Sequence, residues 1–196
     1  MKRFLMFGVS SILAVIPVLS QAATQPPSPS ELWNEVQTLR MNNALMVGSK
    51  AYQPGSRTID AYTIDLANKA ENDAIRKAGS IQKVTRYPNG ALVVKENFNE
   101  QRKLTGITAM LKLDGYDPAD RNWVMAAYTP AGKVVGYGKI PACIACHTMV
   151  TKQDFVFAPP PDQMLPVSVW KGFFPKQDIA PVYAELLRTH ADAIVK

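Results

Sequence analysis

Hydrophobic and polar positions follow two different periods along this chain. Between Glu31 and about Met46, apolar residues recur every three or four positions, which predicts a helix, and Ser30 stands where its N-terminal cap is expected. The segment IDAYTIDL (59–66) alternates as a strand does, and NKAENDAIRKAG (68–79) predicts a short helix that ends at Gly79. The first part of the chain is therefore expected to fold as helix, strand and helix.

The middle of the chain changes to the pattern of β-strands. A Pro-Asn-Gly turn precedes ALVVKENF (91–98), and LTGITAMLKL (104–113) follows with residues of similar type. In NWVMAAYTPAGKVVGYGKI (122–140), two apolar arms flank a turn at Pro130-Ala131-Gly132, which predicts a hairpin. The last segment, 178–196, has the period of an amphipathic helix. Together these patterns predict an α+β fold with an antiparallel β-sheet core and flanking N- and C-terminal helices.

The first 22 residues have the three-part form of a secretory signal peptide. Lys2 and Arg3 precede an apolar run, and small residues close it at Ala22. Because the run is broken by Pro17 and is shorter than the roughly 20 residues of a membrane span, residues 1–22 are predicted to be cleaved rather than to anchor the protein. The mature chain is expected in the periplasm, without a membrane span.

Composition and charge exclude two classes of partner. The formal net charge is +6 and falls by two when Lys2 and Arg3 leave with the signal peptide. The remaining basic residues are scattered, so neither a nucleic-acid-binding stripe nor a polybasic membrane patch is expected. After a proline- and serine-rich flexible leader at 23–30, residues 31–196 suit a single domain with one core.

Cysteine occurs only in the pentapeptide CIACH, residues 143–147. This is the attachment pattern of c-type haem, in which Cys143 and Cys146 form thioethers with the porphyrin vinyl groups and His147 binds the iron. A structural zinc site would need four cysteine or histidine ligands, and His147 lies too close to Cys146 for a tetrahedral site. A thioredoxin-like redox pair belongs at a helix start within a βαβ unit, whereas this motif follows a hairpin. The pattern predicts one covalently attached haem c per chain.

The class of haem protein depends on the sixth iron ligand. Met149 is too close to the motif to reach the opposite side of the porphyrin, Met164 lies in a proline-rich stretch, and His190 lies in the last predicted helix. Packing is the commoner role of such residues. The residues therefore offer no strong sixth ligand, and an electron carrier with a sixth protein ligand such as Met164 remains an alternative.

Three segments in this order and spacing resemble the cytochrome P-460 family: YPNGALVVKENF, NWVMAAYTPAGKV and CIACHTMVTKQDFVF. The most specific parts are G-x-x-x-V-K-E and C-x-x-C-H followed by D-F-V-F, and the resemblance extends from about Ala51 to Phe157. The family includes hydroxylamine-oxidising cytochromes and nitric-oxide-binding relatives, the beta-type cytochromes c′. The resemblance implies an antiparallel sheet with flanking helices, a five-coordinate haem and, in many members, a homodimer.

The resemblance also assigns roles to residues of two strands. In the hydroxylamine-oxidising members a strand lysine is joined covalently to the porphyrin edge, and Lys95 is the matching residue. Glu96 is expected to face the other way, toward solvent. The same members keep a distal carboxylate on the next strand, where Thr108 stands here, and threonine is a poor base. Phe98 is expected to contact the haem.

Several other side chains fit either the pocket or the core. Trp123 and Tyr128 suit both roles, and Asp114, Asp117 and Asp120 are expected to be solvated carboxylates of a turn.

The sequence thus predicts a periplasmic monohaem cytochrome that binds or acts on hydroxylamine or nitric oxide and exchanges electrons with a periplasmic partner. Hydroxylamine oxidation, nitric oxide binding without turnover and simple electron transfer are the three alternatives.

Overall fold

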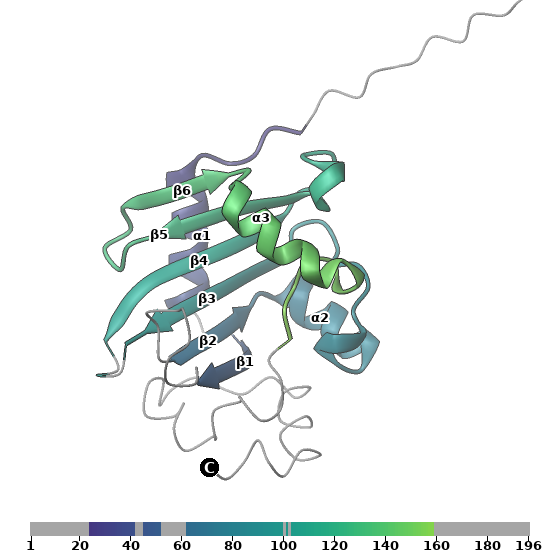
Figure 1. Cartoon of the computed structure of the whole chain (residues 1–196), viewed down its shortest axis with the longest axis horizontal. Coiled ribbons are helices and arrows are strands. Elements are labelled where there is room, and N and C mark those ends of the chain that lie inside the picture. Colours follow the sequence, from purple (N-terminus) through teal and green to yellow (C-terminus); the bar gives the residue numbers. More distant parts are fainter. Residues whose placement is uncertain (1–23, 42–44, 52–61, 100, 102, 159–196) are drawn as a thin grey trace, which may run out of the picture.

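The described residues form one antiparallel sheet. The computed structural model describes residues 24–41, 45–51, 62–99, 101 and 103–158, and its six strands pair in sequence order (Figure 1). The predicted α+β class with an antiparallel core is confirmed. The signal peptide predicted at 1–22 and the helix predicted at 178–196 lie outside the described residues. No helix within those residues is long and apolar enough to cross a membrane.

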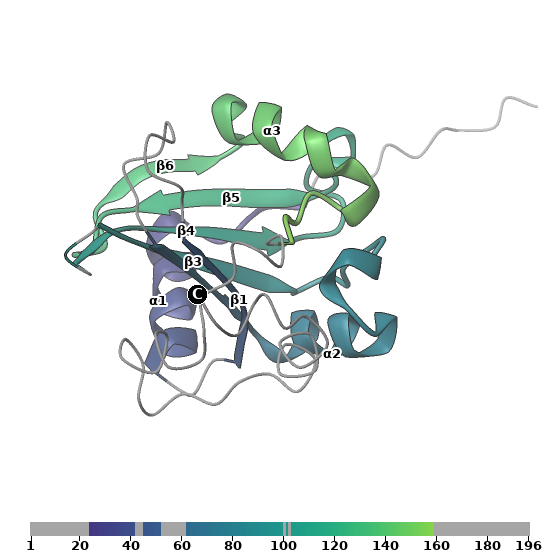
Figure 2. The ribbon, with the colours of Figure 1, turned by 60° about the horizontal axis from the view of Figure 1, so that its bottom comes forward.

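The strands are β1 (Leu45–Ala51), β2 (Tyr62–Ala67), β3 (Leu92–Phe98), β4 (Leu104–Lys112), β5 (Trp123–Tyr128) and β6 (Val134–Gly138). The helices are α1 (Pro29–Met41), α2 (Lys69–Ala78) and α3 (Pro141–His147), with 3-10 turns η1 (Ile81–Lys83), η2 (Pro118–Asp120) and η3 (Thr148–Gln153). Helices α1 and α3 lie on opposite sides of the sheet (Figures 1 and 2).

Two predicted elements are confirmed with their ends. Helix α2 begins after Asn68, whose side chain accepts a hydrogen bond from the backbone of Glu71, and ends at Gly79 with φ 84°. The hairpin of β5 and β6 turns at Gly132, which has φ 85° and donates its N–H to the Thr129 carbonyl at 2.9 Å.

Helix α1 corrects two predictions. The N-terminal cap is Ser28, not Ser30, because Ser28 Oγ accepts from the Glu31 N–H at 3.3 Å while Glu31 Oε2 accepts from the Ser28 N–H at 2.6 Å. This reciprocal pair is a capping box. The helix ends at Met41, and Met46 belongs to β1, where it pairs with Leu66. Residues at the end of the predicted helix, such as Met46, therefore belong to a strand that pairs with β2, although helical periodicity had placed them in the helix.

Glu96 faces away from Lys95 as predicted, but the expectation that it is exposed to solvent is wrong. Its side chain is fully buried and forms an ion pair with Arg40 of α1. Alternation along β3 gives only the side of the sheet, and α1 covers that side with Leu32 and Val36, which are both 0% exposed. Burial raises the pKa of the Glu96 carboxyl, and the Arg40 guanidinium opposes this rise.

We expect Arg40→Met to lower the free energy of unfolding by about 2 kcal/mol at neutral pH, since it leaves the Glu96 carboxylate buried without its cation. The loss should shrink at low pH, where Glu96 is protonated and needs no cation. Urea unfolding at pH 7.5 and pH 4 measures both values. An Arg40→Lys control keeps the charge and should lose less, while an equal loss at the two pH values would contradict this assignment.

A candidate cofactor site

Helix α3 carries the CIACH motif on two short turns. Pro141 occupies the start of the helix, where its missing N–H is not needed. Both thiols are free: Cys143 is half-buried and Cys146 is exposed. Burial raises the pKa of Cys143, a nearby Lys95 charge opposes this rise, and Cys146 adds to it. Two reduced thiols three residues apart on one helix are therefore available for covalent attachment.

The His147 ring is oriented by the backbone that follows α3. Its Nδ1 lies 2.5 Å from the Phe155 carbonyl oxygen, and its ring makes an edge contact with Phe157 at 5.2 Å between centroids. A proton on Nδ1 donates to this carbonyl and leaves Nε2 as the lone-pair nitrogen. Burial lowers the pKa of His147, while the Phe155 carbonyl opposes and the Lys95 charge adds to this effect. The neutral imidazole required of an iron ligand is thus favoured.

Lys95 lies on the side of the sheet that faces α3. The ladder pairs it directly with Asp65 of β2 and with Thr108 of β4. Its positive charge acts on both Cys143 and His147. The strand register therefore places Lys95 on the side of the sheet that α3 covers, and its covalent bond to a porphyrin stays a prediction.

The row of paired residues that contains Lys95 is built mostly from small residues. From β1 to β6 the row, which we call the Lys95 row, reads Gly48, Asp65, Lys95, Thr108, Ala127 and Gly136. At its β6 end, a Cβ on Gly136 would lie 3.1 Å from Ile140 Cδ1, so α3 begins tightly against the sheet there. The small side chains from Thr108 to Gly136 leave room over this part of the sheet for a flat group. The residues present fit a haem on this side.

Two carboxylates, one of them paired with Lys95 in the strand ladder, were not recognised from the sequence. Asp65 is half-buried directly opposite Lys95, and Glu71 of α2 is fully buried. Within the described part of the chain, neither Glu71 oxygen has a hydrogen-bond partner. Burial raises the pKa of Glu71 well above its usual value, and the Asp65 charge adds to the rise. The strand alternation in 59–66 was the available signal for Asp65, since it places Asp65 and Thr63 on one side.

We expect Glu71→Gln to make the folded protein more stable at pH 7.5 by about 1–3 kcal/mol, with little gain at pH 4. A raised folded pKa means that the folded state binds more protons than the unfolded state above pH 4.5, so wild-type stability falls as pH rises through this window. Glutamine removes that fall. Urea unfolding of both proteins across this pH range tests the prediction, and a gain that is independent of pH would refute it.

The remaining predicted residues have mainly structural contacts. Tyr128 donates to the Pro29 carbonyl at 2.9 Å on the α1 side, and Trp123 Nε1 donates to the Asp154 carbonyl at 2.7 Å. Phe98 is 6% exposed and pairs with Tyr62, which continues the alternation on the side of Glu96. Its contact with haem stays a prediction.

The carboxylates of the β4–β5 connection are engaged elsewhere. Asp117 is buried and lies 3.0 Å from Lys139, so the expectation of a solvated side chain is wrong for it. Asp114 remains accessible, with Arg86 at 3.7 Å. Met149 is 73% exposed. Met164 and His190 lie outside the described residues.

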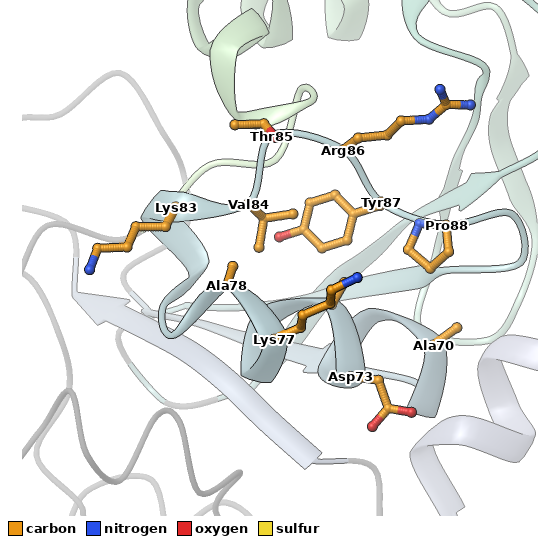
Figure 3. Close-up of a pocket in the computed structure, with 11 residues that line it drawn as sticks. Ala70, Asp73, Lys77, Ala78, Lys83, Val84, Thr85, Arg86, Tyr87 and Pro88 are labelled. Carbon is orange, nitrogen blue, oxygen red and sulfur yellow. The ribbon is translucent and has the colours of Figure 1, made fainter.

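A pocket of about 680 Å³ lies elsewhere, between α2 and residues 83–88. Lys77, Lys83 and Arg86 stand around it, and the Tyr87 ring points toward α2 (Figure 3). Neither the CIACH motif nor Lys95 lines it. This pocket is therefore separate from the side of the sheet that holds the motif.

A comparison with known protein families matches the segments that form the candidate site on the α3 side of the sheet. The family model described as cytochrome P-460 matches residues 44–158, a range that contains the Lys95 row and the CIACH motif. No curated protein matches the chain. Within the described part of the chain, no three histidine, cysteine or acidic side chains gather to hold a metal ion.

Proposed function

This chain belongs to the cytochrome P-460 family, and from that premise we propose that it is a periplasmic cytochrome with one haem c, used on a small nitrogen species such as hydroxylamine or nitric oxide. Cys143 and Cys146 form the thioethers and His147 binds the iron. When bound, the haem supplies an iron that changes oxidation state and keeps one coordination position for the ligand.

The observation that carries this proposal is the position of Lys95 on the side of the sheet that α3 covers. Lys95 reaches Cys143 and His147 electrostatically, and its row has small side chains on either side of Asp65, Lys95 and Thr108. His147 is already oriented by the Phe155 carbonyl with Nε2 available. A strand lysine joined to the porphyrin edge is what the resemblance implies for hydroxylamine-oxidising members.

The presence of Asp65 favours oxidation of hydroxylamine over binding of nitric oxide without turnover. Oxidation of hydroxylamine would release protons, so a base must lie within reach of the substrate. Thr108 is a poor base, whereas Asp65 holds a carboxylate at the neighbouring position of the same row. We assign Asp65 the role of proton acceptor, and the electrons leave to a periplasmic redox partner. Without this role, the same site would bind nitric oxide without turnover.

The absorption spectrum of the purified ferrous protein tests the proposal. The full chain is produced in a bacterium that matures c-type cytochromes, and its mass is measured after denaturation. One haem retained in the denatured protein supports thioether attachment, and a high-spin spectrum supports an open coordination position. A colourless protein with the mass of the bare chain would refute the proposal, and sharp low-spin bands would indicate the electron carrier instead.

We expect Lys95→Ala to abolish any broad red shift of the ferrous band, because that shift reports the bond between the lysine and the porphyrin. Haem content should stay unchanged, since Lys95 is not needed for the thioethers. Lys133→Ala, at an exposed lysine of the β5–β6 turn, is the matched control and should keep the wild-type spectrum. An unshifted wild-type band would show that the bond does not form.

We expect Asp65→Asn to reduce hydroxylamine-dependent reduction of an artificial electron acceptor by about 10²-fold or more, because amides cannot accept the protons. Nitric oxide binding should remain, since it needs only the open iron position. If the wild-type protein binds nitric oxide but reduces no acceptor with hydroxylamine, the binding function is the correct one.

A further inference from the structure

The turn that follows η3 holds two residues in an unusual backbone conformation. Asp154 has φ 53° and Phe155 has φ 71°, both in the left-handed region. Residues with a Cβ rarely adopt it, because the Cβ approaches the carbonyl oxygen. Two such residues in succession therefore need contacts that hold them in place.

Asp154 is held from three directions. Its Oδ2 accepts hydrogen bonds from Lys112 Nζ and from the Tyr87 backbone N–H, both at 2.7 Å. Its carbonyl oxygen accepts from Trp123 Nε1 at 2.7 Å. Asp154 is 0% exposed and Lys112 is 3% exposed, so this ion pair is shielded from water. Strands β4 and β5 and the segment before β3 thus fix the same residue.

The consequence lies one residue further along the chain. The Phe155 carbonyl is the group that lies 2.5 Å from His147 Nδ1. The Phe155 N–H also donates to the Val150 carbonyl at 3.2 Å, which closes the turn. The acceptor on the second ring nitrogen fixes the tautomer and orientation of a metal-binding histidine and raises its basicity. The position of the Phe155 carbonyl therefore depends on how firmly Asp154 is held.

We propose that Asp154 is a positioning residue: bound to Lys112, Tyr87 and Trp123, it holds the Phe155 carbonyl against His147 and so sets the electron-donating strength of that imidazole. This rests on the proposed function, because it takes His147 to be the iron ligand. A more basic imidazole stabilises ferric over ferrous iron. Loosening Asp154 should therefore weaken the bond between His147 and the iron and raise the reduction potential.

The double variant Lys112→Met/Asp154→Gly tests this. Glycine accepts a positive φ without strain and removes the carboxylate, while methionine removes the charge that would otherwise be left unpaired. In the ferrous protein we expect a lower iron–histidine stretching frequency by resonance Raman spectroscopy. The redox equilibrium should shift toward the ferrous form about tenfold, which is about 59 mV for one electron.

The matched control is Arg40→Met/Glu96→Gln, which removes a buried ion pair on the opposite side of the sheet. It should leave both readouts unchanged. Wild-type frequency and potential in a folded Lys112→Met/Asp154→Gly protein would overturn the inference, because a purely structural role would affect only stability. A shift in the control as large as in the test variant would overturn it as well.

If the double variant fails to fold, a second variant tests the inference instead. Trp123→Phe removes the N–H that donates to the Asp154 carbonyl, together with part of the ring that Lys112 and Tyr87 contact, and it should shift both readouts in the same direction by a smaller amount. No shift in a folded Trp123→Phe protein would overturn the inference. A wild-type protein without haem would instead refute the proposed function, and this outcome is recognised before any variant is compared.

Discussion

Replacing both Cys143 and Cys146 with serine is expected to abolish thioether attachment of the haem completely. Thioethers form only with thiols, and no other cysteine occurs in the sequence. The sheet should still fold, because Cys146 is exposed and Cys143 is only half-buried. The denatured double variant should therefore have the mass of the bare polypeptide, while the denatured wild-type protein carries one haem.

A control on the same helix separates attachment from helix stability. Ala142→Ser changes an exposed residue of α3 and keeps both thiols, so it should retain the haem through denaturation. Single replacement of Cys143 or Cys146 should leave one thioether and therefore still retain haem. Haem that survives denaturation of the double variant would show that another residue, with Lys95 as the first candidate, forms a covalent bond of its own.

The sequence predicts the elements whose signals are local. The end of α2 at Gly79 depends on one residue with a positive φ, and the β5–β6 hairpin depends on alternation around one turn. Both can be read from a few neighbouring positions. The end of α1 is different, since helical periodicity continues past Met41 and only pairing of β1 with β2 ends it.

Burial of polar residues could not be predicted in the same way. Alternation correctly placed the Glu96 side chain on the other side of the sheet from Lys95. The solvent exposure of Glu96, however, depends on α1, which is distant in sequence and supplies Arg40. Glu71 follows the same logic, because its burial results from how α2 packs on the sheet. Periodicity gives the direction of a side chain, whereas its solvent exposure is set by whatever element covers that direction.

In the candidate site, too, some residues carry a local sequence signal and others become significant only through the fold. The motif at 143–147 is contiguous and could be identified directly, and Lys95 could be assigned through the resemblance. Asp65 becomes significant only through the strand register, which pairs it with Lys95. Asp154 becomes significant only through contacts with Lys112 and Trp123, which are made across the folded sheet. Residues that position a site through other residues carry no local signal of that role.

The buried pair of Lys112 and Asp154 gives the largest expected effect on stability. Lys112→Met should lower the free energy of unfolding by about 3–5 kcal/mol, because it leaves the Asp154 carboxylate buried without its cation. The methionine also loses the hydrogen bond to the Arg121 carbonyl at 2.5 Å and the contact with the Trp123 ring at 4.8 Å. Thermal unfolding should show a decrease of about 10 °C.

Charge, rather than lost packing, should account for most of this effect. Lys112→Met/Asp154→Asn removes both charges, and the asparagine oxygen can still accept from the Tyr87 N–H, so the double variant should be more stable than Lys112→Met alone. Lys69→Met is the control, since it breaks an exposed pair with Asp73 and should change stability little. If the double variant is no more stable than the single one, the lost lysine contacts rather than the unpaired carboxylate cause the destabilisation.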